Sequence, residues 1–115
     1  MIIVNTEFIP GFDIVQVCGM VQGNTVRAKN VGKDFLAGLK NLTGGELTGY
    51  TELLTESRRE AMDRMISQAQ QMGANAIVNV RFSTSSIAAG AAELYTYGTA
   101  VVVQPVNQEA APQQY

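Results

Sequence analysis

The chain has few of the side chains on which metal centres and nucleophilic catalysis depend. Its 115 residues include one cysteine, Cys18, and no histidine. Ser–His–Asp and Cys–His arrangements and histidine-based zinc sites are therefore impossible. A cysteine nucleophile also needs a neighbouring base or cation that stabilises its thiolate, and none stands beside Cys18 in the sequence. We expect a protein that is not an enzyme and has no catalytic residues; the alternative is an enzyme whose site is shared between subunits.

Cys18 is nevertheless a candidate ligand for a soft metal, because such metals prefer thiolates, thioethers and imidazoles. The chain also has five methionines, but Met62, Met65 and Met72 fall in or beside the apolar stripe of a predicted helix, where methionine commonly fills gaps in a core. One thiol per chain could bind an ion if several copies each supplied a sulfur near a symmetry axis. The simpler interpretation of Cys18 is a small buried hydrophobe in mid-strand.

A second group of candidate site residues is polar and basic. It comprises Asn24, Thr25, Arg27 and Lys29, which precede the first predicted helix, and Arg81 on a neighbouring predicted strand. If these side chains meet at a boundary between subunits, they could hold an anionic small molecule. They could also pair with acidic residues of the next subunit, and we favour this salt-bridged interface.

Two strands are predicted in the first part of the chain. Residues 2–4 are β-branched and apolar and are followed by the turn residues Pro10-Gly11, which is typical of a short edge strand. A valine-rich strand covers residues 13–22. It ends at Gly23-Asn24, which is either a hairpin turn into residues 25–29 or a bulge within one long strand, and we slightly favour the bulge.

Two helices are predicted next. Residues 31–42 place apolar side chains at helical spacing, and a longer amphipathic pattern covers residues 50–72. The exposed face of the longer helix carries opposite charges four residues apart, such as Glu60 and Arg64, which support a helix. Gly73 follows as the expected terminator, because glycine tolerates the left-handed conformation at a helix end.

The C-terminal part predicts two more strands, over residues 76–82 and 93–104, joined by a loop of small residues over 83–92. The tail, 105–115, has no apolar periodicity and is expected to be disordered, which leaves a single domain over residues 1–104. The order is strand, strand, helix, helix, strand, strand. It indicates an α+β fold in which two helices cover one face of an antiparallel sheet.

The composition favours association between copies of the chain. Hydrophobic residues make up 46% of it and charged residues 16%, whereas about a quarter of an average soluble domain is charged. Helices can cover only one face of the sheet. The other face carries apolar and aromatic residues of both long strands, and a contiguous patch of this kind promotes association; these residues are Ile14, Cys18, Met20, Tyr95, Tyr97, Val101 and Val103. Either loops or other subunits must cover this face, and we favour subunits.

Other partners are not indicated. The net charge of −2, with eight Lys and Arg, does not match the basic surface of a dedicated nucleic-acid binder. No apolar run approaches the roughly 18 residues that a membrane span needs, and the N-terminus has no basic region of a signal peptide. We expect a cytoplasmic protein that binds neither nucleic acid nor membrane.

Five segments in order resemble the YbjQ family of small bacterial proteins. The resemblance covers residues 1–104, and the segments are GMVQGNTVRAK from Gly19, DFLAGLKNLTGGE from Asp34, YTELL from Tyr50, residues 69–82 with GANAIVNVRF, and YGTAVVV from Tyr97. The resemblance implies a fold similar to that of dodecin subunits and assembly into homo-oligomeric rings, typically pentamers. The family has been labelled as heavy-metal-binding, although its biochemical function is not established. A metal cofactor is thus suggested by the resemblance only, and the ligand stays unknown.

Overall fold

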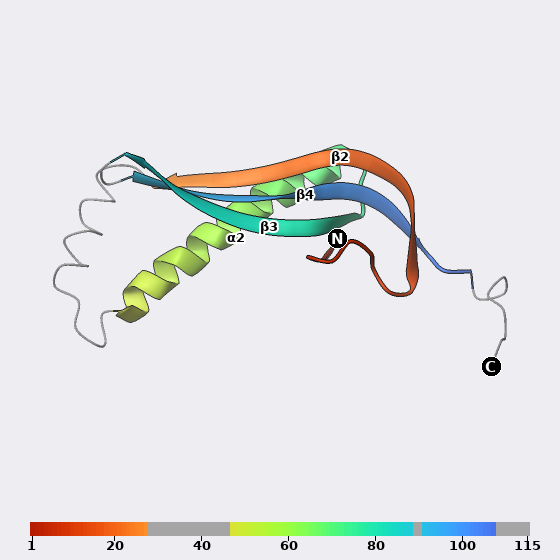
Figure 1. Ribbon diagram of the computed structural model, residues 1–115, viewed down its shortest axis with the longest axis horizontal. Coiled ribbons are helices and arrows are strands. Elements are labelled where there is room, and N and C mark those ends of the chain that lie inside the picture. The colour runs from red at the N-terminus through yellow and green to blue at the C-terminus, as the bar shows by residue number, and fades with distance from the viewer. Residues whose placement is uncertain (28–46, 89–90, 108–115) are drawn as a thin grey trace.

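The computed structural model describes residues 1–27, 47–88 and 91–107, in which one helix packs against one face of a four-stranded sheet (Figure 1). The strands are β1 (Ile2–Ile3), β2 (Phe12–Arg27), β3 (Ala76–Ala88) and β4 (Ala91–Pro105), and the helix is α2 (Leu47–Gln71). The fold is therefore α+β, as expected. The helix predicted over 31–42 lies outside the described residues, so the packing of two helices is not described.

The sheet is mixed, with the strand order β1-β3-β4-β2. β4 pairs antiparallel with both β2 and β3, whereas β1 pairs parallel to β3. The expected antiparallel sheet is thus right for the three long strands and wrong for β1. The short strand does lie at an edge, where Val4 donates its backbone N–H to the carbonyl of Ile77 at 3.0 Å. β1 and β3 are separated by about 70 residues in the sequence. The direction in which two such distant strands pair leaves no local signal, so the apolar pattern of residues 2–4 could not predict a parallel pair.

β2 is one continuous strand of 16 residues, so the hairpin alternative at Gly23-Asn24 is wrong and the favoured single long strand is confirmed. Gly23 pairs with Thr96 and Asn24 with Tyr95 in regular register, and the irregularities lie nearer the start of β2, around Val15 and Cys18. The predicted bulge is therefore misplaced. Gly23 serves close packing instead, because a Cβ there would collide with the carbonyl oxygen of Ala61 on α2.

The loop predicted over 83–92 is also wrong. β3 continues to Ala88 and β4 begins at Ala91, so the two strands form a long hairpin. Ser83 pairs with Tyr95 and Ser85 with Glu93. Both serines are exposed, so the strand carries polar residues there without burying them. Small polar residues fit a strand whose backbone is paired, although their composition is typical of a loop.

α2 confirms the predicted long helix, with its start three residues earlier. Ala61, Met65 and Ala69 follow one another at intervals of four and are fully buried, which places one stripe of the helix on the sheet. The helix ends as expected at Gly73, whose φ is +81°. Gly73 donates to the carbonyl of Gln70 at 3.0 Å and Ala74 to that of Ala69 at 3.1 Å, the paired bonds of a Schellman cap.

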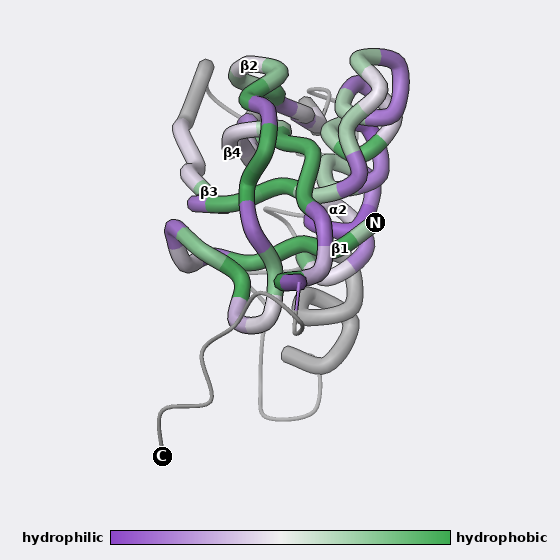
Figure 2. The backbone as a smooth tube through the Cα atoms, turned by 90° about the vertical axis from the view of Figure 1, so that its right-hand side faces the viewer, coloured by the Kyte–Doolittle hydropathy of each residue, from purple (hydrophilic) through white to green (hydrophobic). Residues whose placement is uncertain are grey.

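Two clusters of buried residues lie on the two faces of the sheet. The larger one joins α2 to the sheet and contains Val21, Met65, Ala69, Ala74, Ile77, Val80 and Ala100. The smaller one contains Ile9, Ala76, Val78, Val101 and Val103, with Ile2, Val4 and Phe12 packed against it. The N-terminal segment, which is the part of the chain before β2, therefore covers part of the second face through Ile2, Val4 and Ile9. Figure 2 shows hydrophobic stretches on β1, β2 and β3. The expectation that subunits cover Val101 and Val103 is wrong, because residues of this segment do so.

Candidate functional site

The face of the sheet opposite α2, here called the outer face, carries polar and aromatic side chains in rows across three strands. Thr96 points toward α2, since its hydroxyl lies 3.9 Å from the sulfur of Met65, so its neighbours Tyr95 and Tyr97 point to the outer face. Directly paired residues share a face. One row is therefore Arg81, Tyr97 and Gln22, and the next is Ser83, Tyr95 and Asn24.

Hydrogen bonds and stacking tie these rows together. The rings of Tyr95 and Tyr97 are stacked, with centroids 5.2 Å apart and an interplanar angle of 28°. The Tyr95 hydroxyl donates to Oε1 of Gln22 at 2.7 Å. Asn24 donates through Nδ2 to Oε2 of Glu93 at 2.8 Å. Around residues 22–24, 81–83 and 95–97 the outer face is thus an ordered aromatic and polar surface, whereas the apolar residues that the sequence predicted on this face remain exposed at Ile14 and Met20 of β2.

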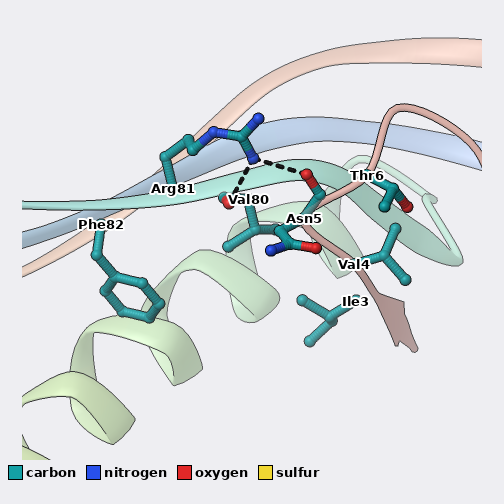
Figure 3. A pocket seen from close by; sticks show the side chains of 7 residues that line it. All are labelled: Ile3, Val4, Asn5, Thr6, Val80, Arg81 and Phe82. Carbon is teal, nitrogen blue, oxygen red and sulfur yellow. Dashed lines mark hydrogen bonds between the residues drawn. The ribbon is translucent and has the colours of Figure 1, made fainter.

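Arg81 is held in place at the rim of this face. Its Nη1 donates to the carbonyl oxygens of Asn5 at 2.7 Å and of Val80 at 3.0 Å (Figure 3). Asn79, just before it, has a left-handed φ of 56° and donates its N–H to the carbonyl of Thr6 at 2.9 Å. The register of β3 against β4 shifts between Val78 and Arg81. This bulge sets the position from which the Arg81 side chain departs.

An open cavity of about 510 Å³ lies where the N-terminal segment leaves β3. It is lined by Ile3, Val4, Asn5, Thr6, Val80, Arg81 and Phe82. In Figure 3 the Phe82 ring and the Arg81 guanidinium lie on opposite sides of β3. Arg81 thus lines the cavity from the outer-face side, and its second nitrogen, Nη2, points away from the two carbonyls (Figure 3).

The structure does not gather the five predicted polar residues into one cluster within a single copy. Asn24 and Arg81 share the outer face but lie on strands separated by β4. Thr25 lies on the other face, buried under α2, where its hydroxyl donates to the carbonyl of Ser57 at 3.3 Å. Arg27 pairs with Ala92 at the end of β2, and Lys29 lies outside the described residues.

Cys18 does not lie in a metal centre within the described part of one chain. It is a free, half-buried thiol that packs against the core cluster beneath α2, in agreement with its interpretation as a small hydrophobe. Over residues 1–27, 47–88 and 91–107, no three Cys, Asp or Glu side chains gather as metal ligands do. The donors of a single copy, so far as they are described, do not fit a heavy-metal site.

The two edges of the sheet differ, which the sequence did not indicate. Along β2, side chains of α2 occupy the outer backbone groups: the N–H of Gln22 donates to Oε1 of Gln68 at 2.7 Å, and Nη1 of Arg64 donates to the carbonyl of Asn24 at 2.5 Å. Nη2 of Arg64 also pairs with Glu60 at 2.6 Å, which confirms the predicted i,i+4 pair. Such contacts protect an edge strand from pairing.

The opposite edge is open along part of β3. Val80 donates its N–H to the carbonyl of Val4 at 3.1 Å, and the pairing of β1 with β3 covers only Ala76 and Ile77. From Phe82 to Ala88, β3 pairs with β4 and with no other described strand. Among the described residues, the β2 edge is therefore protected at Gln22 and Asn24, whereas the β3 edge has no strand paired to it from Phe82 onward.

Comparison with known proteins identifies the family. A family model described as "Putative heavy-metal-binding" matches residues 1–104. The chain belongs to the UPF0145 (YbjQ) family. A UPF0145 protein of Acinetobacter baylyi is 69% identical over 96 residues, which cover 84% of this chain and 89% of the relative. A UPF0145 protein of Hahella chejuensis is 64% identical over 90% of this chain and its own entire length.

The UPF0145 family is wider than the bacterial group that the resemblance suggested. A member from the archaeon Archaeoglobus fulgidus is 58% identical over 88% of this chain and 94% of its own. A crystal structure of a protein of unknown function from Pediococcus pentosaceus, assigned to the DUF74 family, has the same fold. The comparison gives a TM-score of 0.56 at 13% sequence identity and covers 90% of this chain and 98% of that one. In the described part of this UPF0145 chain, no helix has the length and apolar character of a membrane span.

Proposed function

We propose that this UPF0145 protein is a non-enzymatic subunit of a homo-oligomeric ring, with five copies as the family resemblance implies, and that it binds a small ligand where subunits meet. The observation that carries the proposal is the exposed apolar surface of β2. Met20 is 73% exposed and Val17 65%, and Ile14 and Val15 are exposed beside them. Large apolar side chains in a contiguous group on one strand mark an interaction surface.

The shape of the chain supports the same proposal. Its radius of gyration is 19.0 Å and it measures 62 × 30 × 16 Å, whereas a compact domain of this length has a radius of gyration of about 13 Å. The long β3–β4 hairpin and β2 extend together in Figure 1, with α2 beneath them. An extended sheet buries less apolar surface within one chain than a compact fold does, so association contributes a larger share of the burial.

A ring needs two different surfaces on each copy, because each subunit contacts its neighbours head to tail. The sheet offers such a pair at opposite edges. One is the apolar stretch at the start of β2, over residues 14–20, and the other is the open edge of β3, over residues 82–88. We propose that the first surface of one copy meets the second surface of the next.

Charge substitution on β2 tests this proposal. The double variant Val17→Glu, Met20→Glu places two carboxylates in the proposed interface, whereas Ser67→Glu places one on an exposed position of α2 and is the matched control. We expect light scattering to give a smaller particle for the double variant at micromolar concentration, and an unchanged particle for the control. A double variant that keeps the wild-type mass excludes this surface as the interface.

Heavy-metal binding is the rival proposal, and the description of the family model favours it. Because one copy offers a single thiol and no imidazole, an ion would need sulfur ligands from several copies. The half-buried position of Cys18 beneath α2 gives little support to such a shared site.

A further inference from the structure

We infer that Arg81 binds a carboxylate on the outer face of the sheet, through the Nε–H and Nη2–H groups of its guanidinium. The inference deepens the ligand-binding part of the proposed function by naming a residue and a chemical class. The carboxylate has two possible sources, a free organic acid or an acidic side chain of a second copy. Only the second source rests on the proposed ring.

The first observation is that the guanidinium is already fixed. Both N–H groups of Nη1 are engaged, with the carbonyls of Asn5 and Val80 as acceptors. A guanidinium is planar and rigid, so these two bonds also fix the direction of Nε–H and of the two Nη2–H groups. A ligand that binds them meets a side chain whose freedom the fold has already reduced, which favours affinity.

The second observation is that the remaining donors have no acceptor among the described residues. The guanidinium has five N–H groups, of which two are used. No carboxylate in residues 1–27, 47–88 or 91–107 forms an ion pair with Arg81. Nε–H and the nearer Nη2–H are parallel and match the two oxygens of one carboxylate, which is the strongest geometry for this pair.

The surroundings favour a carboxylate attached to a flat apolar group. Tyr97 is the cross-strand partner of Arg81 on the same face, and its ring stacks with that of Tyr95. This aromatic pair gives the apolar part of a ligand a surface beside the guanidinium. The carboxylate of Glu93 lies further along the same face of β4 and disfavours anions of higher charge, so a monoanion fits better than a phosphate.

Benzoate is the probe, because it combines a carboxylate with a flat ring. Binding is measured by the NMR shift of the Arg81 Nε–H on titration with benzoate, with neutral benzamide and inorganic phosphate as controls. The affinity is then measured by calorimetry for Arg81→Met, Arg81→Lys and the matched control Arg59→Met, which removes an exposed arginine of α2. Arg81→Lys keeps the charge but lacks the paired donors, so it decides the result if Arg81→Met fails to fold.

For a free acid, we expect saturable binding of benzoate and at least about tenfold weaker binding in Arg81→Lys, with Arg59→Met unchanged. For a carboxylate of a second copy, we expect no benzoate binding but a smaller particle for Arg81→Lys than for Arg59→Met in light scattering. The inference is overturned if benzoate does not bind and Arg81→Lys assembles like the wild type, or if benzamide binds as well as benzoate. A monomeric wild type that binds benzoate refutes the ring and leaves the Arg81 site intact.

Discussion

The packing of α2 on β2 at Gly23 makes a sharp prediction for the variant Gly23→Ala. The added Cβ would lie 2.6 Å from the backbone nitrogen of Met65 and closer still to the carbonyl oxygen of Ala61. Because comfortable contacts between such atoms are about 3.5 Å or longer, the helix must move outward by about 1 Å. That movement loosens the contacts of Ala61, Met65 and Ala69, which are all fully buried. We expect a loss of about 3 kcal/mol of folding free energy.

The assay is denaturant unfolding followed by circular dichroism, with every protein at the same concentration because assembly shifts apparent stability. A loss of this size corresponds to a fall in Tm of roughly 10 °C for a domain of this length. Gly73→Ala is the contrasting variant. A Cβ there meets nothing within 4 Å, but φ is +81°, so only backbone strain of about 1 kcal/mol is expected. Equal stability of Gly23→Ala and the wild type would refute the close packing of α2 on β2.

Three further predictions concern the edge of β2, the bulge of β3 and the thiol. Gln68→Ala removes the acceptor of the Gln22 N–H, so we expect hydrogen exchange at that amide to accelerate while exchange at Val21 stays slow; unchanged protection at Gln22 would contradict the capped edge. Asn79→Gly relieves a left-handed φ of 56° and should raise stability by about 1 kcal/mol in thermal unfolding, whereas a loss of stability would show that the Asn side chain has a role there. If copies share a thiolate site, Cys18→Ser should abolish stoichiometric binding of Cd²⁺ in calorimetry, and unchanged binding would exclude Cys18 as a ligand.

The elements with strong local signals could be predicted from the sequence. The period of α2, its apolar stripe and its glycine terminator all lie within one stretch of about 25 residues, and the helix agrees with the prediction closely. Over residues 93–104, the side chains that alternate between the two faces of β4 predict a strand equally clearly. Period and capping are local properties, so a single sequence carries them.

The features that depend on distant contacts could not be predicted. Gly23 has the sequence context of a turn, and only the approach of α2 explains why a glycine stands in the middle of a strand. The serines of β3 have the composition of a loop, but pairing with β4 makes them a strand. The N-terminal segment covers Val101 and Val103, which no periodicity could indicate.

In the candidate site too, local features could be predicted from the sequence and contacts between distant residues could not. Arg81 lies on a strand, as predicted, and shares the outer face with Asn24, but β4 separates the two residues, so the predicted cluster does not form within one copy. The anchoring of the Arg81 guanidinium by Asn5, which is 76 positions away, and the neighbouring tyrosine pair had no signal in the sequence. Thr25 was grouped with Asn24 by proximity, but adjacent residues of a strand point to opposite faces.

The mass of the native particle tests the central claim most directly. Native mass spectrometry of the wild-type protein at micromolar concentration should give a single species at a multiple of the chain mass of 12.3 kDa, five times that mass for the proposed ring. A single species at the mass of one chain would contradict the claim that copies of this protein cover the exposed apolar surface of β2 for one another.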